Sequence, residues 1–181
     1  MDFESIELSE WVYILHPRPV AIVIAGTWND YSAMPASWIM PVSRKPPMVA
    51  IAISKKRFTY HYIVERREFA ICILSYEYLK NVHFLGSVSG KDIRDKIVAA
   101  GLTKIKSRKI EVPVVGESMV IAECKLRNII ESGDHDIIVG EIIDVYKKKG
   151  IEIPNPKSYR IPLHVLKNMY TRAIESIDIV Q

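Results

Sequence analysis

The sequence predicts a mainly β protein, a small barrel with a few short helices. Two observations support this fold class: several short β-branched apolar runs each end near turn residues, and segments with helical periodicity are fewer and shorter. The chain has 181 residues, of which 49% are hydrophobic and 25% are charged. That composition suits one globular domain with a real core, so we expect a single domain over residues 1–181.

Five segments have the composition of strands. Three are short buried runs, and the last two are longer and are joined by a turn at residues 131–134, as in an antiparallel pair. The five predicted strands cover residues 20–25, 48–53, 69–74, 119–130 and 137–146. The sheet is therefore expected to dominate the fold.

Three further segments have helical character. The first covers residues 60–67 and follows Thr59 as an N-cap, and the second covers residues 76–85. The third begins at Ser89, whose hydroxyl can cap the first turn, and ends at Gly101. Ile93, Ile97 and Ala100 fall on one face of this third segment, which predicts an amphipathic helix covering the sheet edge or the barrel mouth.

Composition excludes several classes of protein. No apolar run approaches the roughly 20 residues of a membrane span, and the acidic N-terminus is unlike a signal peptide, so we expect a cytoplasmic protein without membrane contact. Cys72 and Cys124 stand alone in apolar stretches and are expected to be buried, reduced thiols. The net charge of +4 favours anionic ligands in general.

Sequence motifs exclude further classes. The basic runs at residues 55–57 and 147–149 lack interleaved aromatic residues, which argues against a nucleic-acid partner. The histidines lack metal-ligand spacing, so no metal site is expected. The sequence also contains no GxGxxG, P-loop or GxSxG motif.

Residues 32–43 form the first segment with potential chemistry. The segment is rich in small hydroxyl residues and prolines, which suits a backbone that runs close to a flat ligand. Trp38 can form one wall of a ligand ring site or can pack into the core, and composition favours the core.

Residues 54–59 form the second such segment. Ser54, Lys55, Arg57 and Thr59 lie between a strand end and a helix start, where free backbone amides and cations make a phosphate cradle. The alternative is an ordinary solvated basic loop.

Two further segments carry histidine. His135 follows a Gly-Asp turn, and it is either a plain hairpin residue or an imidazole that a neighbouring aspartate orients beside a ligand. His83 and Phe84 either line the mouth of a pocket or pack a helix end on the sheet.

Taken in order, these segments resemble the flavin reductase-like, FMN-binding split-barrel family, which includes the flavoredoxins and the reductase components of two-component monooxygenases. The resemblance covers residues 16–146, most of the chain, and leaves residues 147–181 as a tail. The matching residues are 17–21, 37–39, 41–43, 46–50, 59–60, 83–86 and 133–136.

The resemblance implies a split-barrel homodimer with FMN near the interface. It assigns flavin-ring contacts to Ala36, Ser37 and Trp38, and it places His83 and Phe84 beside the cofactor. It assigns His135 the catalytic position beside the nicotinamide. The residues that it implies for the ribityl phosphate are Ser54, Lys55, Arg57 and Thr59.

The implied activity is reduction of flavin by NADH or NADPH, with hydride passing from the nicotinamide to flavin N5. The alternative is a flavoredoxin-type FMN electron carrier or flavin-storage protein with little nicotinamide activity. A monooxygenase or a ferredoxin-like protein is then the expected redox partner.

Two departures from the family pattern bear on this choice. Ser32 stands where the family commonly has Asn, and the tail around His164 lacks the two glycines of an HLGGxxY pattern. Without these glycines, we expect the tail backbone to approach a ligand differently from that of an active reductase.

Overall fold

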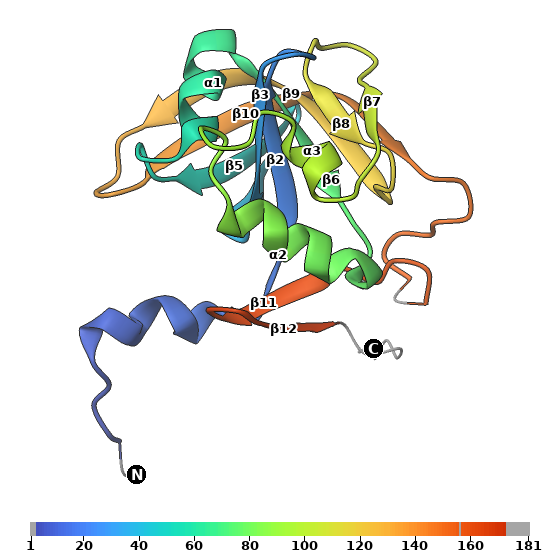
Figure 1. The fold of residues 1–181 in the computed structure, drawn as a ribbon. Coiled ribbons are helices and arrows are strands. Elements are labelled where there is room, and N and C mark those ends of the chain that lie inside the picture. Colours follow the sequence, from blue (N-terminus) through green and yellow to red (C-terminus); the bar gives the residue numbers. More distant parts are fainter. Residues whose placement is uncertain (1–2, 156, 173–181) are drawn as a thin grey trace.

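The computed structural model describes residues 3–155 and 157–172, and it is built around a seven-stranded antiparallel sheet (Figure 1). The strand order is β3-β2-β6-β9-β10-β5-β4. The strands are β2 (Ala21–Gly26), β3 (Tyr31–Ala36), β4 (Ile39–Arg44), β5 (Pro47–Ile53), β6 (Glu68–Ile73), β9 (Val120–Ile130) and β10 (Asp136–Lys147). All five predicted strands are present, and the mainly β prediction is confirmed.

The two edges of this sheet meet at one end. β3 and β4 are the edge strands, yet only Ser37 and Trp38 separate them along the chain. The sheet must therefore curl until its edges converge at this two-residue link, while β3 and β4 stay unpaired with each other. This arrangement is a split barrel, and its seam runs beside Ser37 and Trp38.

β2 is buried along its whole length because both of its faces are covered. Side chains alternate between the two faces of a strand, so Ala21 and Val23 point into the barrel while Ile22 and Ile24 point outward. The outward face packs against an outer layer that includes α2 (Leu79–Ser87), α3 (Lys96–Ala99) and β8 (Pro113–Val115). Two separate cores on one strand explain its unbroken apolar run.

The helices are short and decorate the barrel (Figure 1). α1 (Phe58–Arg66) connects β5 to β6, and α2 follows a 3₁₀ turn, η2 (Tyr76–Tyr78). The short strand β7 (Lys104–Lys106) pairs with β8 in a separate hairpin. The first two predicted helices are therefore confirmed, with shifted ends.

The predicted helix from Ser89 to Ala100 is wrong over most of its length. Only α3 is helical, and Ser89 caps no helix but accepts a hydrogen bond from the Lys91 amide at 3.1 Å. The Tyr31 hydroxyl explains the late start, because it binds the Asp95 carboxylate and also accepts a hydrogen bond from the Ile97 amide. Of the predicted apolar face, Ile97 and Ala100 are buried, whereas Ile93 lies before α3 and is only partly buried.

The predicted N-cap at Thr59 is also wrong, because α1 begins at Phe58, two residues before the predicted start, and Arg57 holds the cap position. Thr59 lies inside the first turn and is 1% exposed. Its hydroxyl donates to the hydroxyl of Ser32 at 2.8 Å instead of capping the helix backbone.

A short strand before the barrel pairs with a hairpin that follows the barrel along the chain (Figure 1). β1 (Arg18–Pro19) pairs with β11 (Pro162–Leu166), which pairs with β12 (Met169–Arg172). Since β1 leads directly into β2, this pairing holds the tail hairpin next to the start of the barrel. Before β1, the 3₁₀ helix η1 (Leu8–Leu15) extends away from the barrel.

Both cysteines are free and buried, as predicted. Burial raises the pKa of the Cys72 thiol to about 11 and that of Cys124 to about 12, so both stay protonated at neutral pH. Within residues 3–155 and 157–172, no helix is long and apolar enough to cross a membrane.

Candidate active site

Two adjoining cavities lie beside the barrel seam, between β3, the α1 start and the α2 end. The central cavity has a volume of about 250 Å³ and the side cavity one of about 260 Å³. Met34, Arg57, Gly86 and Ser87 line both, so the two volumes share a wall. The two cavities are therefore immediate neighbours, an arrangement that suits a ligand with two parts.

The side cavity is strongly basic. Lys56, Arg57 and Lys96 line it, and no Asp or Glu is among its described lining residues. Phe58 and Thr59, the first two residues of α1, also line this cavity. The first backbone N–H groups of a helix have no acceptor within the helix, so they are available to a ligand. Cations and free amides together suit a phosphate group.

Lys96 is the buried cation of the side cavity, with 2% of its surface exposed. Its amine donates to the carbonyl oxygens of Leu85 at 2.7 Å and Val88 at 2.9 Å, at the end of α2. Burial, and then the nearby charge of Arg57, lower the pKa of Lys96 to about 8. An anion in the cavity would offset this charge and stabilise the ammonium form.

Small residues let the α2–α3 loop approach the start of α1. A Cβ on Gly90 would lie 2.7 Å from Cδ1 of Phe58 and 2.8 Å from Oγ of Ser32. Ser32 in turn holds Thr59 through their buried hydrogen bond. A side chain at Gly90 would therefore disturb the floor of the side cavity.

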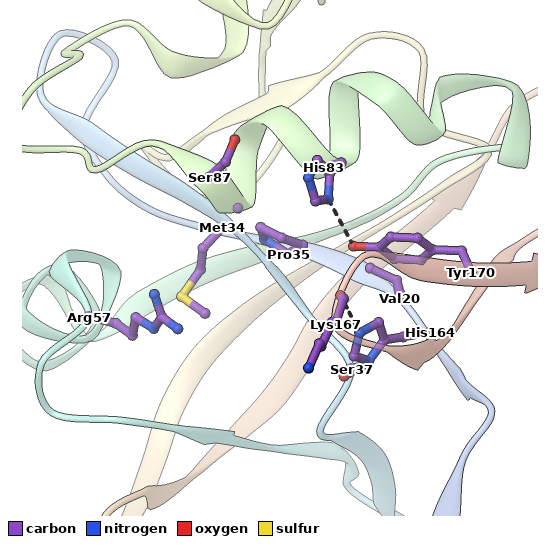
Figure 2. A pocket seen from close by; sticks show the side chains of 11 residues that line it. Val20, Met34, Pro35, Ser37, Arg57, His83, Ser87, His164, Lys167 and Tyr170 are labelled. Atoms are coloured by element: carbon purple, nitrogen blue, oxygen red, sulfur yellow. Dashed lines mark hydrogen bonds between the residues drawn. The ribbon is translucent and has the colours of Figure 1, made fainter. Parts of the chain in front are cut away.

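The central cavity lies between α2 on one side and the tail hairpin on the other (Figure 2). His83 projects from α2 with its Nδ1 3.5 Å from the Tyr170 hydroxyl of β12. Ser37 and Lys167 line the opposite side, and the Nε2 atom of His164 donates to the Lys167 carbonyl at 3.0 Å. The tail therefore lines the cavity in spite of its missing glycines.

Trp38 and His135 form a separate group across the seam. Their ring centroids are 4.8 Å apart, and the Arg18 guanidinium lies 5.6 Å from the Trp38 centroid. The Asp134 carboxylate lies 2.9 Å from Nδ1 of His135, and this hydrogen bond lowers the pKa of Asp134. An aspartate thus orients the imidazole, although His135 does not line the central cavity.

A third, apolar cavity of about 310 Å³ lies on the Trp38 side of the seam. Leu15, Trp38, Ile39 and Met40 are among the residues that line it. Trp38 therefore serves as a cavity wall and does not belong to either buried core cluster.

The predicted phosphate residues separate into two groups. Arg57 and Thr59 line the side cavity. Lys55 lines neither adjoining cavity, because its amine lies 3.1 Å from Glu131 and 3.5 Å from the buried Asp136 carboxylate. Ser54 also lies outside both cavities, and its hydroxyl faces the Lys56 amide at 3.4 Å.

The residues predicted to lie beside the flavin ring also fall into two groups, one that lines the central cavity and one that lies in the core. Ser37 and His83 line the central cavity. Ala36 is 7% exposed and belongs to the core inside the barrel. Phe84 packs against the other core, which lies between the barrel and its outer layer. Whether any of these residues contacts a ligand stays a prediction.

Several cavity residues escaped the sequence analysis. Lys96 and Lys167 add two cations, and Ser87 and Gly90 belong to the close approach of the α2 end and its loop, next to Gly86 of the matching segment 83–86. The Gly-Ser-Val-Ser-Gly run at residues 86–90 was a usable signal, because small and hydroxyl residues gather where backbone meets ligand. For Lys167 the signal is the comparison with the HLGGxxY pattern, in which it takes the place of a glycine.

A family model described as "Flavin reductase like domain" matches residues 14–170 of the chain. An uncharacterised protein of Archaeoglobus fulgidus is 29% identical over 181 residues, which cover 98% of this chain and 99% of that protein. A flavin reductase (NADH) of Kitasatospora aureofaciens is 27% identical and aligns with 79% of this chain and 72% of its own.

Solved structures have the same fold. Flavoredoxin of Desulfovibrio vulgaris (Miyazaki F) is 27% identical, with a TM-score of 0.81 over 91% of both chains. The FMN-binding protein from Thermus thermophilus with bound p-hydroxybenzaldehyde is 24% identical, with a TM-score of 0.87 over 99% of both chains. The predicted split barrel is thereby confirmed.

Proposed function

Because the chain belongs to the flavin reductase-like family, we propose that it binds FMN and transfers hydride to it from NADH or NADPH. The observation that carries this proposal is the pair of adjoining cavities, one strongly basic and one lined by aromatic, small and aliphatic side chains together with Arg57 and Lys167. FMN has the matching two parts, a phosphate and a planar ring system joined by a ribityl chain.

The described residues fit such a ligand. Arg57, Lys96 and the α1 amides would hold the phosphate, and Thr59, fixed by Ser32, would support that wall. Ser37, His83 and Tyr170 would line the ring site. The absence of carboxylates from the described lining residues removes the main repulsion against a phosphate.

The residues of the chain act by positioning. When bound, FMN supplies the atom that accepts hydride, so the protein needs to align two flat rings and limit water access. The Asp134–His135 pair beside Trp38 is proposed to position the nicotinamide, because its imidazole is oriented and half-buried.

The test is an anaerobic absorption spectrum of the purified, FMN-loaded protein before and after NADH, and separately NADPH. Bleaching of the bound flavin faster than that of free FMN supports the proposal. No FMN binding, or no bleaching above the free-flavin rate with either donor, contradicts it.

A flavoredoxin-type carrier is the second candidate, and the altered tail favours it. Lys167 occupies the cavity side where the family pattern has glycine, which changes the space open to a nicotinamide. Such a carrier would exchange electrons with a ferredoxin-like protein or a monooxygenase. FMN that stays bound and is reduced by a ferredoxin-like donor, but not by NAD(P)H, would favour this candidate.

We also propose that two copies form a homodimer through the apolar side of the seam. η1 exposes Leu8, Trp11, Ile14 and Leu15, each with more than half of its surface accessible. Exposed apolar groups in such number on one short helix favour burial against another protein surface. The apolar cavity, which Leu15 and Met40 line, adjoins this helix.

A further inference from the structure

Lys167 occupies a backbone conformation that a lysine rarely adopts. Its φ angle is +48°, in the left-handed region that glycine adopts freely and that costs other residues of order 1 kcal/mol. The residue lies in the turn between β11 and β12 and lines the central cavity (Figure 2). A strained residue beside a cavity is a reason to ask what its side chain does there.

The charge of Lys167 has no partner in its surroundings. Within residues 3–155 and 157–172, its ammonium group pairs with no carboxylate, and no Asp or Glu lines the central cavity. Arg57, the other cation of this cavity, also lines the side cavity, where the phosphate would use it. Lys167 lines only the central cavity of these two, so it remains available to a negative charge there.

The ligand that the proposed function places in the central cavity changes charge during the reaction. Oxidised FMN has a neutral ring, and addition of hydride, two electrons and one proton, gives the ring one negative charge. A cation beside the ring therefore attracts the reduced form and leaves the oxidised form nearly unaffected.

We propose that Lys167 makes the cavity bind reduced FMN more tightly than it would without that charge, and so raises the midpoint potential of the bound flavin. This inference rests on the proposed function. By thermodynamic linkage, a change in the ratio of the affinities for reduced and oxidised FMN determines the change in the midpoint potential of the bound flavin. Lys167 thus favours a protein that keeps its reduced flavin over one that releases it.

The expected effect of Lys167 on the ratio of the two FMN affinities follows from the exposure of its side chain. Lys167 is exposed, so water and salt weaken its field, and a contact of a few ångströms gives an effect of about three- to tenfold in the affinity ratio. Tenfold corresponds to about 30 mV for a two-electron couple.

Three substitutions separate charge from backbone strain. K167Q removes the charge and keeps a side chain at φ +48°, whereas K167G removes the charge and relieves the strain, so it should fold at least as well. K167R keeps the charge. Lys149→Gln, at an exposed loop position outside the described cavities, is the control for a general loss of one positive charge.

The experiment measures the Kd of oxidised FMN, the Kd of reduced FMN and the midpoint potential of the bound flavin for each variant. K167Q and K167G should both weaken binding of reduced FMN by about three- to tenfold relative to oxidised FMN and lower the potential accordingly, while K167R and Lys149→Gln match the unaltered protein. An affinity ratio within twofold of the unaltered protein in both neutral variants overturns the inference. So does an equal change in Lys149→Gln.

The two proposals fail differently. If the unaltered protein binds no FMN, the proposed function is wrong and the role of Lys167 falls with it. If the unaltered protein binds FMN, but substitution of Lys167 leaves the ratio of the affinities for reduced and oxidised FMN unchanged, only the inference about Lys167 is wrong.

Discussion

Arg57 and Lys55 are two residues apart in the sequence but have different surroundings. Arg57 lines both cavities, whereas Lys55 is engaged by Glu131 and Asp136. The residues alone leave a phosphate cradle and a solvated loop both open, and the resemblance assigns both cations to the phosphate, since a basic loop does not reveal which cation already has a carboxylate partner. The structure favours Arg57 for ligand binding and Lys55 for holding the loop against the β9–β10 turn.

We therefore expect Arg57→Ala to weaken FMN binding by about 1.5–3 kcal/mol, the range for a lost hydrogen bond to a charged group. Lys55→Ala should change it by less than about 0.5 kcal/mol. Fluorescence titration of FMN measures both. A larger loss in Lys55→Ala than in Arg57→Ala would show that the phosphate lies elsewhere.

We expect Lys96 to make FMN binding depend on pH. Its pKa is lowered to about 8 in the free protein, so the ammonium form is nearly complete at pH 7 and is lost as the pH rises through 8. A phosphate favours the ammonium form, so affinity should be highest below pH 8 and fall between pH 8 and 9.5.

Titrations at pH 7, 8, 9 and 9.5 test this expectation. Lys96→Met should bind FMN more weakly at pH 7 and show a flat profile. Riboflavin, which lacks the phosphate, is the matched ligand control and should show no such fall. An FMN profile that stays level in the unaltered protein would exclude Lys96 from the phosphate site.

At the scale of elements, the sequence predicted what local patterns encode. The five strands follow from apolar runs bounded by turn residues, and the two-sided burial of β2 follows from its unbroken apolar composition. The prediction of a helix that starts at Ser89 was wrong, because the Tyr31 hydroxyl, 66 positions before Ile97 in the sequence, determines where α3 begins. The cavities combine residues from β3, α1, α2 and the tail, a grouping that no local pattern contains.

Gly140 of β10 tests the packing of strands inside the barrel. A Cβ there would lie 2.7 Å from Cε1 of the fully buried Phe69 on β6. Gly140→Ala should lower the free energy of unfolding by about 2 kcal/mol or more, the range for overpacking a tight core. Val145→Ala, at a position on the same strand with 61% exposure, is the control and should stay within about 0.5 kcal/mol. Urea denaturation measures both, and equal stability of the two variants would contradict this account.

At the scale of the whole molecule, η1 should hold two copies together. Leu15→Glu combined with Trp11→Glu places charges where we propose a dimer interface, on side chains that are 61% and 52% exposed. We expect a dimer for the unaltered protein and a monomer of about 21 kDa for the double variant, by light scattering after size exclusion. A monomeric unaltered protein would refute the proposed assembly.

The seam also determines how the sheet can meet another molecule. β3 and β4 are its two edge strands, and each carries a proline, Pro35 and Pro41, within its length. Proline has no N–H to donate, and β4 is further interrupted by an irregular register between Pro41 and Ser43. Each edge therefore offers an interrupted row of donors to an added strand, so the covalent chemistry of the chain itself disfavours association by sheet extension, including fibre growth from this sheet.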